Sequence, residues 1–370
     1  MKVLLLGDAS NYHNSLAQGL RKLGHTVCVA SDGSRWMKTD RDIDLTRPFR
    51  GPAGGALLYG RMLTMLASKL SGYDVVQLVS PSFVQLRPSR LLKLLHRLKK
   101  QNGMVWLSAL GTDSNFVRAL TSPNPPLEYS EWQIGGRITA WSDTPEARKA
   151  EWLAQELSDY TDEFYGLIDG AVSALYEYHK VLETTHPSLN LHYGGIPVCL
   201  DALPEPDLTP RDTLNLMYTA HRGREGEKGS LYLLDMLRRL EREFVGKVRL
   251  STPANVPYRD FLELLRGADI VSDQLYSYTP GTTALLAMAL GAASISGGEE
   301  DFYRFIGEDT LRPIINPDPL DLEASYDNLR QLVADCDRLM ELRRDGRRFV
   351  ARHNESSVVA SRFVDAWQKS

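Results

Sequence analysis

Cysteine is scarce in this chain of 370 residues, which contains only Cys28, Cys199 and Cys336. These three form neither a disulfide framework nor the spacing of a metal site, which favours a reducing compartment over secretion. Positive charge is not in excess either. The formal net charge is −4 at pH 7, whereas a dedicated nucleic-acid-binding protein carries a surplus of Lys and Arg, so no nucleic-acid partner is expected.

Long apolar runs are missing as well. The longest, from 284 to 293, is well below the roughly 18 residues that span a bilayer. The run at 3–6 ends at Gly7 and is shorter than the ~7–15 residues of a secretory signal core. We therefore expect a chain that does not cross a membrane, with a buried strand at 3–6.

What the sequence does contain is an alternation of short apolar runs with helical patterns. In the first half, strands are expected at 3–6, 26–30, 74–79, 104–109, 170–175 and 191–193, and helices at 14–23, 56–70, 88–100, 146–165 and 178–185. A Pro-rich linker follows at 197–210. Beyond it, strands are expected at 214–219, 248–251, 270–272 and 293–296, and helices at 229–244, 258–266 and 282–290.

Strands that alternate with helices predict parallel sheets covered on both faces, so the fold class is α/β with two Rossmann-like domains. The first is expected to cover 1–200 and the second 201–350. The chain from 320 to 367 has helical spacing with a break near His353, and its last part, 351–370, is expected to form a separate terminal helix.

A turn between a strand and a helix carries three cations, Arg222, Arg224 and Lys228. Cations beside the unpaired N–H groups of a helix start suit an anion such as a diphosphate. The alternative is a solvated loop in which Glu225 and Glu227 pair with their basic neighbours.

A second motif opens the apolar helix expected at 282–290. The chain breaks at Pro280 and Gly281, and Thr282 or Thr283 can cap the helix that follows. A buried helix whose first turn opens on the carboxyl ends of parallel strands is a good seat for phosphate. The alternative is a core helix with an ordinary Thr cap.

Together these segments resemble the C-terminal half of the family 4 glycosyltransferases, which are retaining enzymes with the GT-B fold. The stretch 223–229 is similar to the Gly-Arg…Lys-Gly turn of that family, and 278–291 is similar to its donor helix, with Gly281, Ala287-Met288-Ala289 and Gly291 shared. Three further matches follow in order along most of the chain: 110–113 resembles the His-Gly-Thr-Asp loop, 192–201 the hinge, and 296–300 the Gly-Gly-x-x-Glu turn.

The resemblance implies two Rossmann-like domains whose parallel sheets face a central cleft, with the acceptor on the first, the nucleotide-sugar donor on the second, and a C-terminal helix that crosses back to the N-terminal domain. It implies transfer of a sugar, with retention, from a nucleotide-sugar donor to a glycan or lipid-linked acceptor in bacterial surface polysaccharide or glycolipid synthesis. No metal and no other cofactor is implied, because Lys and Arg neutralise the departing diphosphate.

Site residues follow from the same match. The catalytic residues would be Asp113, Arg222 and Lys228, and the spacing leaves open whether Arg222 or Arg224 is the arginine of the family. Residues expected to bind substrate are Asp8, Asn11, His13, Arg224, Tyr278, Gly281, Thr282, Thr283 and Glu299. For Asp8, Asn11, His13 and Asp113 the alternative is a polar turn or helix cap.

Three positions depart from the family pattern. Its paired glutamates correspond to Tyr278 and Leu286, and its loop histidine to Leu110. Leu286 cannot accept a hydrogen bond from a ribose. These departures keep open a catalytically silent homologue that binds a nucleotide sugar or a partner protein. An epimerase with the same fold would need carboxylates in the cleft, and the sequence does not indicate which residues these would be.

An Asp-x-Asp pattern between Asp40 and Asp44 could suggest a manganese site, but it lies in an expected loop and lacks the glycine of a calcium-binding loop, so a solvated acidic loop is favoured over a metal site.

The helix at 87–100 is amphipathic and basic. Its leucines at 91, 94, 95 and 98 form one face, as a helix that covers a sheet requires. Its cations on the other faces could contact anionic phospholipid at ~1 kcal/mol each. Both uses are compatible, so we expect a cytoplasmic protein with a peripheral contact on the inner face of the plasma membrane.

Overall fold

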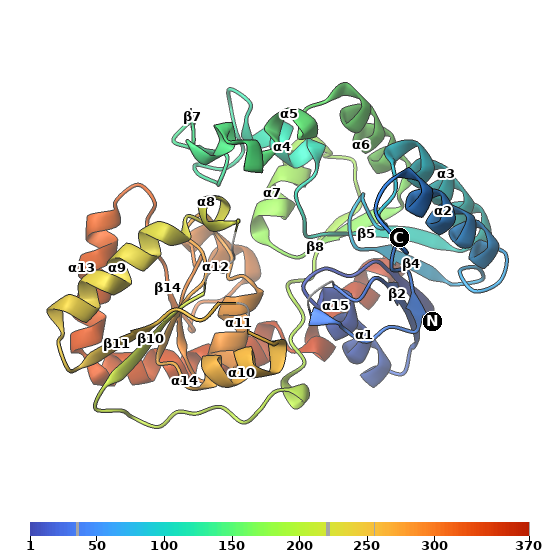
Figure 1. Cartoon of the computed structure of the whole chain (residues 1–370). Helices are drawn as coiled ribbons and strands as arrows, with labels where there is room; N and C mark the ends of the chain where they lie inside the picture. Colours follow the sequence, from blue (N-terminus) through green and yellow to red (C-terminus); the bar gives the residue numbers. More distant parts are fainter. Residues whose placement is uncertain (35–36, 220–222, 255, 370) are drawn as a thin grey trace. The chain divides into compact units, whose positions relative to one another are not determined.

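A computed structural model describes all residues except 35–36, 220–222, 255 and 370 (Figure 1). Its contacts divide the chain into two compact units. Unit 1 comprises Met1–Ala119, Lys149–Pro197 and Ser356–Ser370, and unit 2 comprises Leu120–Arg148 and Val198–Glu355. The sequence pattern had assigned all of 1–200 to one domain, whereas the contacts place 120–148 with the second unit.

Within the described residues, unit 1 is built on a seven-stranded parallel sheet in the order β3-β2-β1-β4-β5-β8-β9. Its strands are β1 (Lys2–Leu6), β2 (Thr26–Ser31), β3 (Ile43–Asp44), β4 (Val75–Leu78), β5 (Met104–Ala109), β8 (Gly170–Ser173) and β9 (Leu191–Tyr193). The run at 3–6 is completely buried, as a strand covered on both faces must be. The expected strand at the N-terminus is therefore confirmed.

Helices alternate with these strands along the chain: α1 (Tyr12–Lys22), α2 (Pro52–Leu66), α3 (Pro88–Gln101), α4 (Ser114–Leu120), α5 (Lys149–Trp152), α6 (Gln155–Leu167), α7 (Tyr176–Thr185) and, at the end, α15 (Ser356–Gln368). The leucines of α3 at 91, 94, 95 and 98 are at most 1% exposed, so this helix covers the sheet with the face that the sequence predicted. A proline in the first turn of α3 fits because the first N–H groups of a helix have no partner within it.

The C-terminal helix α15 returns to unit 1 and packs along α1, as Figure 1 shows near the N-terminus. The two helices come so close that a Cβ atom at Gly19 would overlap the carbonyl of Ser356. The rings of Phe363 and Tyr12 meet edge to face with centroids 6.5 Å apart. The expected crossing of this helix is confirmed.

Unit 2 is built on a parallel sheet in the order β11-β10-β12-β13-β14. Its strands are β10 (Leu214–Tyr218), β11 (Val248–Ser251), β12 (Ile270–Ser272), β13 (Ala293–Ile295) and β14 (Ile314–Ile315). Its helices are α8 (Glu225–Lys228), α9 (Ser230–Glu243), α10 (Tyr258–Arg266), α11 (Thr282–Ala289), α12 (Glu300–Ile306), α13 (Leu322–Ala334) and α14 (Cys336–His353). The α/β fold with two Rossmann-like sheets is thus confirmed.

The segment Leu120–Arg148, here called the insert, adds a small antiparallel hairpin of β6 (Gln133–Ile134) and β7 (Arg137–Ile138). The sequence pattern predicts no strand at these positions. Among the helices of the described part of the chain, none is both long and apolar enough to cross a membrane.

Candidate functional site

The carboxyl ends of β12 and β13 bring two polar residues together in unit 2. Asp273 follows β12 and Ser296 follows β13, and because these strands are parallel neighbours both residues emerge at one edge of the sheet. The Ser296 hydroxyl donates to Asp273 Oδ2 at 3.3 Å, and Lys228 Nζ donates to Asp273 Oδ1 at 2.7 Å. The Asp273 side chain is completely buried, while that of Lys228 keeps 13% of its exposure.

The first turn of α11 lies against the same carboxylate. A Cβ atom at Gly281 would overlap Asp273 Oδ2, so glycine is required by this close approach. No side chain of the described residues caps α11, whose first residues are Thr282 and Thr283. The first N–H groups of a helix have no partner within it and carry a partial positive charge. We call Lys228, Gly281, Thr282 and Thr283 the anion seat.

The chemistry of the anion seat suits a phosphate group. An ammonium has three N–H donors, and the ion pair with Asp273 uses one of the three on Lys228. Its remaining donors and the N–H groups of α11 could together bind phosphate oxygens. Across the described residues, no group of three or more His, Cys, Asp or Glu side chains is arranged to hold a metal ion.

The second expected cation, Arg224, is engaged at the surface. Its Nε donates to Glu227 Oε2 at 2.7 Å, its Nη2 donates to the other oxygen, and its side chain is 56% exposed. The Glu225 carboxylate accepts from the N–H of Gly223 at 2.7 Å. The solvated ion pair is thus present, and because exposed pairs contribute little it could yield to a phosphate. Arg222 lies outside the described residues.

Tyr278 holds the insert and is not free to bind a substrate. Its ring stacks on that of Tyr129 with centroids 4.5 Å apart, and its hydroxyl accepts from the N–H groups of Glu128 at 3.0 Å and Tyr129 at 3.3 Å. Only 6% of Tyr278 is exposed. The expectation that Tyr278 contacts the donor is corrected, because its polar atom is already used by the backbone of the insert.

Glu299, also expected to bind substrate, lies half-buried beside the same tyrosines. Its Oε1 accepts from the Tyr129 hydroxyl at 2.7 Å and from Asn316 Nδ2 at 2.8 Å. These hydrogen bonds show a structural role for Glu299 within unit 2. Contact of Glu299 with a substrate remains a prediction.

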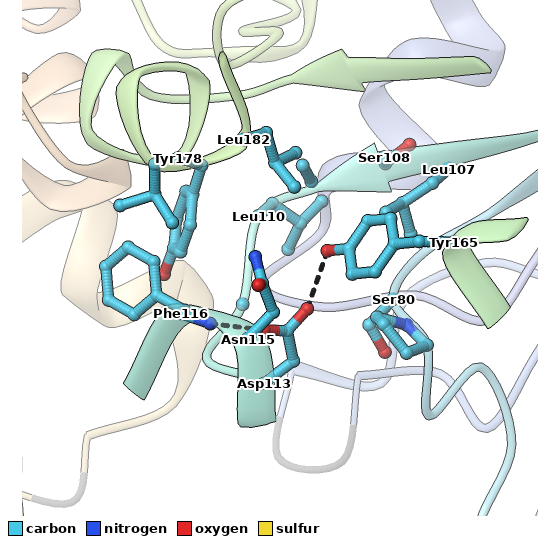
Figure 2. Close-up of a pocket in the computed structure, with 14 residues that line it drawn as sticks. Ser80, Leu107, Ser108, Leu110, Asp113, Asn115, Phe116, Tyr165, Tyr178 and Leu182 are labelled. Carbon is cyan, nitrogen blue, oxygen red and sulfur yellow. Dashed lines mark hydrogen bonds between the residues drawn. The ribbon is translucent and has the colours of Figure 1, made fainter. Parts of the chain in front are cut away.

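In unit 1, Asp113 borders a small pocket at the carboxyl end of β5 (Figure 2). Its Oδ1 accepts from the N–H of Phe116 at 2.8 Å and its Oδ2 from the Tyr165 hydroxyl at 2.7 Å, so the residue caps α4. Burial raises the pKa of Asp113, and these hydrogen bonds act in the opposite direction. The capping alternative is therefore present, and a catalytic role remains a prediction.

The pocket itself is tight. The space enclosed is close to that of one water molecule, too little for a sugar in this conformation. Leu110, Phe116, Tyr178 and Leu182 supply apolar walls around Asp113, as Figure 2 shows. Leu110 stands where the resembling family has its loop histidine, so the pocket has no imidazole at that position.

Asp8 and Asn11 form the turn between β1 and α1. Asp8 accepts from the N–H of His13 at 2.9 Å and from the Thr39 hydroxyl at 2.8 Å. Asn11 adopts a left-handed conformation with φ 65°, and its amide donates to the Ser15 hydroxyl at 3.2 Å. The polar-turn alternative accounts for both, and their contact with a ligand remains a prediction.

His13 is part of a buried polar chain. Its Nδ1 is 2.7 Å from the Gly7 carbonyl and its Nε2 is 3.0 Å from the Ser108 hydroxyl. Ser108 also accepts from Gln77, and Gln77 accepts from the Trp367 indole, both at 3.1 Å. Burial lowers the pKa of His13 to about 4, so the ring is neutral at pH 7. The expectation that His13 contacts a ligand is corrected, because it is completely buried with both nitrogens engaged.

The Asp-x-Asp pattern is occupied by protein partners. Asp42 accepts from the Val29 N–H at 2.8 Å and from Arg21 at 3.0 Å, and Asp44 accepts from the Thr46 hydroxyl at 2.6 Å. Asp42 and Asp44 thus have protein partners, as expected for a charged loop.

Two residues of the site carried weak signals or none. Asp273 directly follows an apolar strand. A carboxylate at the carboxyl end of a buried strand is often a functional residue, so the sequence carries an indication of Asp273. Tyr129 offered no signal, since its partner Tyr278 is 149 positions away in the chain.

No known family profile matches the sequence, and no curated protein matches it. Solved structures do. Sucrose-phosphate synthase from Thermosynechococcus elongatus is 12% identical with a TM-score of 0.63, covering 100% of this chain and 99% of that one. An alpha-glucosyltransferase in complex with UDP-glucose and DNA containing an abasic site is 12% identical with a TM-score of 0.61 and 99% of both chains covered. HepE from Anabaena, in complex with UDP and glucose, is 10% identical with a TM-score of 0.60 and full coverage of both.

These likenesses over the whole length show that the chain has the GT-B fold found in glycosyltransferases. At such identity they show the fold, and the activity has to be argued from the site.

Proposed function

We propose that the protein is a glycosyltransferase that takes its sugar from a nucleotide-diphosphate sugar. The observation that carries the proposal is the anion seat, where Lys228 and the uncapped first turn of α11 meet at the buried carboxylate of Asp273. The solved structures with UDP and UDP-glucose support it, because they share the fold over the full length of the chain.

In the proposed reaction, the bond between the anomeric carbon and the diphosphate oxygen breaks, and its electron pair stays on that oxygen. The acceptor hydroxyl forms the new bond to the anomeric carbon and passes its proton to the departing diphosphate oxygen. Negative charge thus grows on the leaving diphosphate. Lys228 and the N–H groups of Thr282 and Thr283 would stabilise it, and one such donor is worth about 3–4 kcal/mol. Retention of configuration follows from the family resemblance.

Asp273 would act as a positioning residue for Lys228. A lysine side chain is flexible and loses rotamer freedom when it binds. Here the buried carboxylate fixes the ammonium before a ligand arrives. The seat is therefore preorganised, which lets its charge act on the transition state without a reorganisation cost.

For the acceptor we propose a glycan or a lipid-linked sugar, as in the synthesis of bacterial surface polysaccharides or glycolipids. The family resemblance gives Asp113 of unit 1 a catalytic role in this proposal. The charge distribution supports a lipid. From 45 to 112 the only acidic residue is Asp74, whereas the basic residues are Arg47, Arg50, Arg61, Lys69, Arg87, Arg90, Lys93, Arg97, Lys99 and Lys100.

The same stretch contains α2 and α3, which pack on each other. Phe49 is 50% exposed and Leu57 is 57% exposed in the same stretch of the sequence. Exposed apolar side chains in a stretch rich in cations suit the interface of an anionic bilayer, so we propose that α2 and α3 make the peripheral membrane contact on the cytoplasmic side.

A silent homologue that binds a nucleotide sugar or a partner protein is the second candidate. Leu286 is 7% exposed and Leu110 lines the pocket, so neither supplies the polar group that the family has there. Turnover separates the two candidates.

The test is donor hydrolysis and thermal shift with a panel of nucleotide sugars. Wild type is expected to be stabilised by one member of the panel and to hydrolyse it slowly. Lys228→Met should lose both effects, whereas Lys180→Met, which removes an exposed ion pair with Glu183, should keep both. If no member of the panel stabilises the protein, the donor site is refuted. Stabilisation without turnover, even with acceptors present, would favour the silent homologue.

A further inference from the structure

The insert is a folded element of its own. Gln133, 1% exposed, donates to the Leu127 carbonyl and accepts from the Gly136 N–H, both at 2.8 Å. Trp132 is 1% exposed, and its ring meets that of Trp141 with centroids 5.0 Å apart. These buried contacts make the insert a compact body and not a loose connection.

One end of this body grips the loop that leads into α11. Tyr129 stacks on Tyr278, and the Tyr129 hydroxyl lies 2.7 Å from Glu299 Oε1 and 3.2 Å from the Ser277 carbonyl. Tyr278 stands three residues before Gly281, which directly precedes the first residue of α11. Tyr129 thus contacts the segment that leads into the first turn of this helix.

The other end of the insert lies against α8. The ring of Trp141 approaches Gly226 so closely that a Cβ atom there would overlap it. Gly226 is two residues before Lys228 in the same short helix. Trp141 thus packs against the helix that carries the ammonium of the anion seat.

We propose that the insert assembles the anion seat by positioning its two halves, with Tyr129 and Trp141 as the positioning residues. The contacts assign the insert to unit 2, although the chain on both sides of it belongs to unit 1, and it touches α8 and the loop that leads into α11. The inference rests on the proposed function, because it concerns how the same site is built for a nucleoside diphosphate.

Tyr129→Phe is the sharpest variant, because it keeps the stacked ring and removes only the hydroxyl. Tyr326→Phe is its matched control. Tyr326 is 5% exposed, as Tyr129 is 4% exposed, and its hydroxyl is also 2.7 Å from a carboxylate, that of Glu243. Both changes remove one buried hydroxyl from a carboxylate, and only the first lies beside the anion seat.

The readout is calorimetric affinity for the nucleoside diphosphate that binds wild type and for the matching nucleoside. We expect Tyr129→Phe to lower the affinity for the nucleoside diphosphate at least fivefold and to leave the affinity for the nucleoside unchanged. Tyr326→Phe should change neither affinity. A loss confined to the diphosphate distinguishes positioning of the seat from general loss of structure, which would affect both ligands.

A second pair of variants tests the contact with α8. Gly226→Ala should displace Trp141 and lower the affinity for the nucleoside diphosphate at least tenfold. Gly166→Ala, in a helical position with open space around it, should not. If wild type binds the diphosphate and both Tyr129→Phe and Gly226→Ala match their controls, the role of the insert is overturned while the donor site stands. If wild type binds no nucleoside diphosphate, the proposed function itself fails.

Discussion

Lys228 and Asp273 form an ion pair of 2.7 Å in which the carboxylate is completely buried and the lysine side chain keeps 13% of its exposure. This asymmetry suits an anion-binding lysine. The carboxylate fixes the cation through one of its N–H donors, and the other donors of the ammonium can serve a ligand. In an ion pair with both side chains exposed, the lysine would be mobile and its donors would be shared with water.

The ion pair gives a prediction for stability. Removing one partner of a buried pair leaves an uncompensated charge, which costs about 3–5 kcal/mol in typical cases. Because Lys228 is partly exposed, we expect Lys228→Met to cost about 3 kcal/mol in the free energy of unfolding, measured in urea. Lys228→Met with Asp273→Asn should cost less than Lys228→Met alone.

This double variant also serves the binding test, since it removes the cation without leaving an uncompensated buried charge. If the single and double variants are equally stable, the buried charge of Asp273 does not need compensation by Lys228, which contradicts the prediction.

His13 gives a pH prediction. Its pKa in the folded protein is lowered to about 4 from an ordinary value of 6.5, so the unfolded chain takes up a proton more readily. The contribution to stability is complete above pH 6.5 and is lost as the pH falls towards 4, at about 1.4 kcal/mol per pH unit. His13→Gln should remove this part of the pH dependence. The check is denaturant unfolding of both proteins between pH 4.5 and 7, and parallel stability curves would contradict the prediction.

The docking of α15 gives a prediction about packing. At Gly19 an added methyl group would overlap the Ser356 carbonyl, so Gly19→Ala should destabilise the protein by about 2 kcal/mol despite the better helix propensity of alanine. Gly60→Ala in α2, where nothing lies within 4 Å of the added atom, should be neutral or stabilising. Thermal unfolding of the two variants makes the comparison, and a harmless Gly19→Ala would show that α15 does not need this close approach.

Membrane contact through α3 predicts a loss of affinity on removal of its exposed cations. Replacing Lys93, Arg97 and Lys100 by Gln should reduce the free energy of membrane binding by about 3 kcal/mol. This corresponds to a roughly hundredfold lower affinity for vesicles rich in anionic lipid. The control replaces three exposed arginines of α14, Arg338, Arg344 and Arg348, by Gln and is expected to bind as wild type does. Cosedimentation with vesicles measures both, and equal loss in the two variants would point to net charge alone.

The strands and the covering helices were predictable because burial on both faces demands continuous apolar runs, such as 3–6 in β1. The start of α2 was misplaced for a local reason. The pattern predicts it at 56, but the helix begins at Pro52 and its first four residues include two glycines, one of which, Gly54, allows close contact with the Phe49 carbonyl. Glycines weaken a helical pattern in the sequence while serving the packing.

The insert could not be predicted, because its place is fixed by tertiary contacts such as the stacking of Tyr129 on Tyr278. The site was predictable in part. Strand, turn and helix spacing pointed to Lys228 and Thr282, and the structure brings their elements together through Asp273. The turn after β1 misled, because His13 points inward to Ser108 and Gln77 in a way that no local pattern encodes.

The most direct test of the account is calorimetric titration of wild type with nucleoside diphosphates, each beside its own nucleoside. The anion seat predicts that one diphosphate binds at least tenfold more tightly than its nucleoside, and that Lys228→Met combined with Asp273→Asn abolishes the difference. Equal affinity for the diphosphate and the nucleoside, or no binding of any diphosphate, would contradict it.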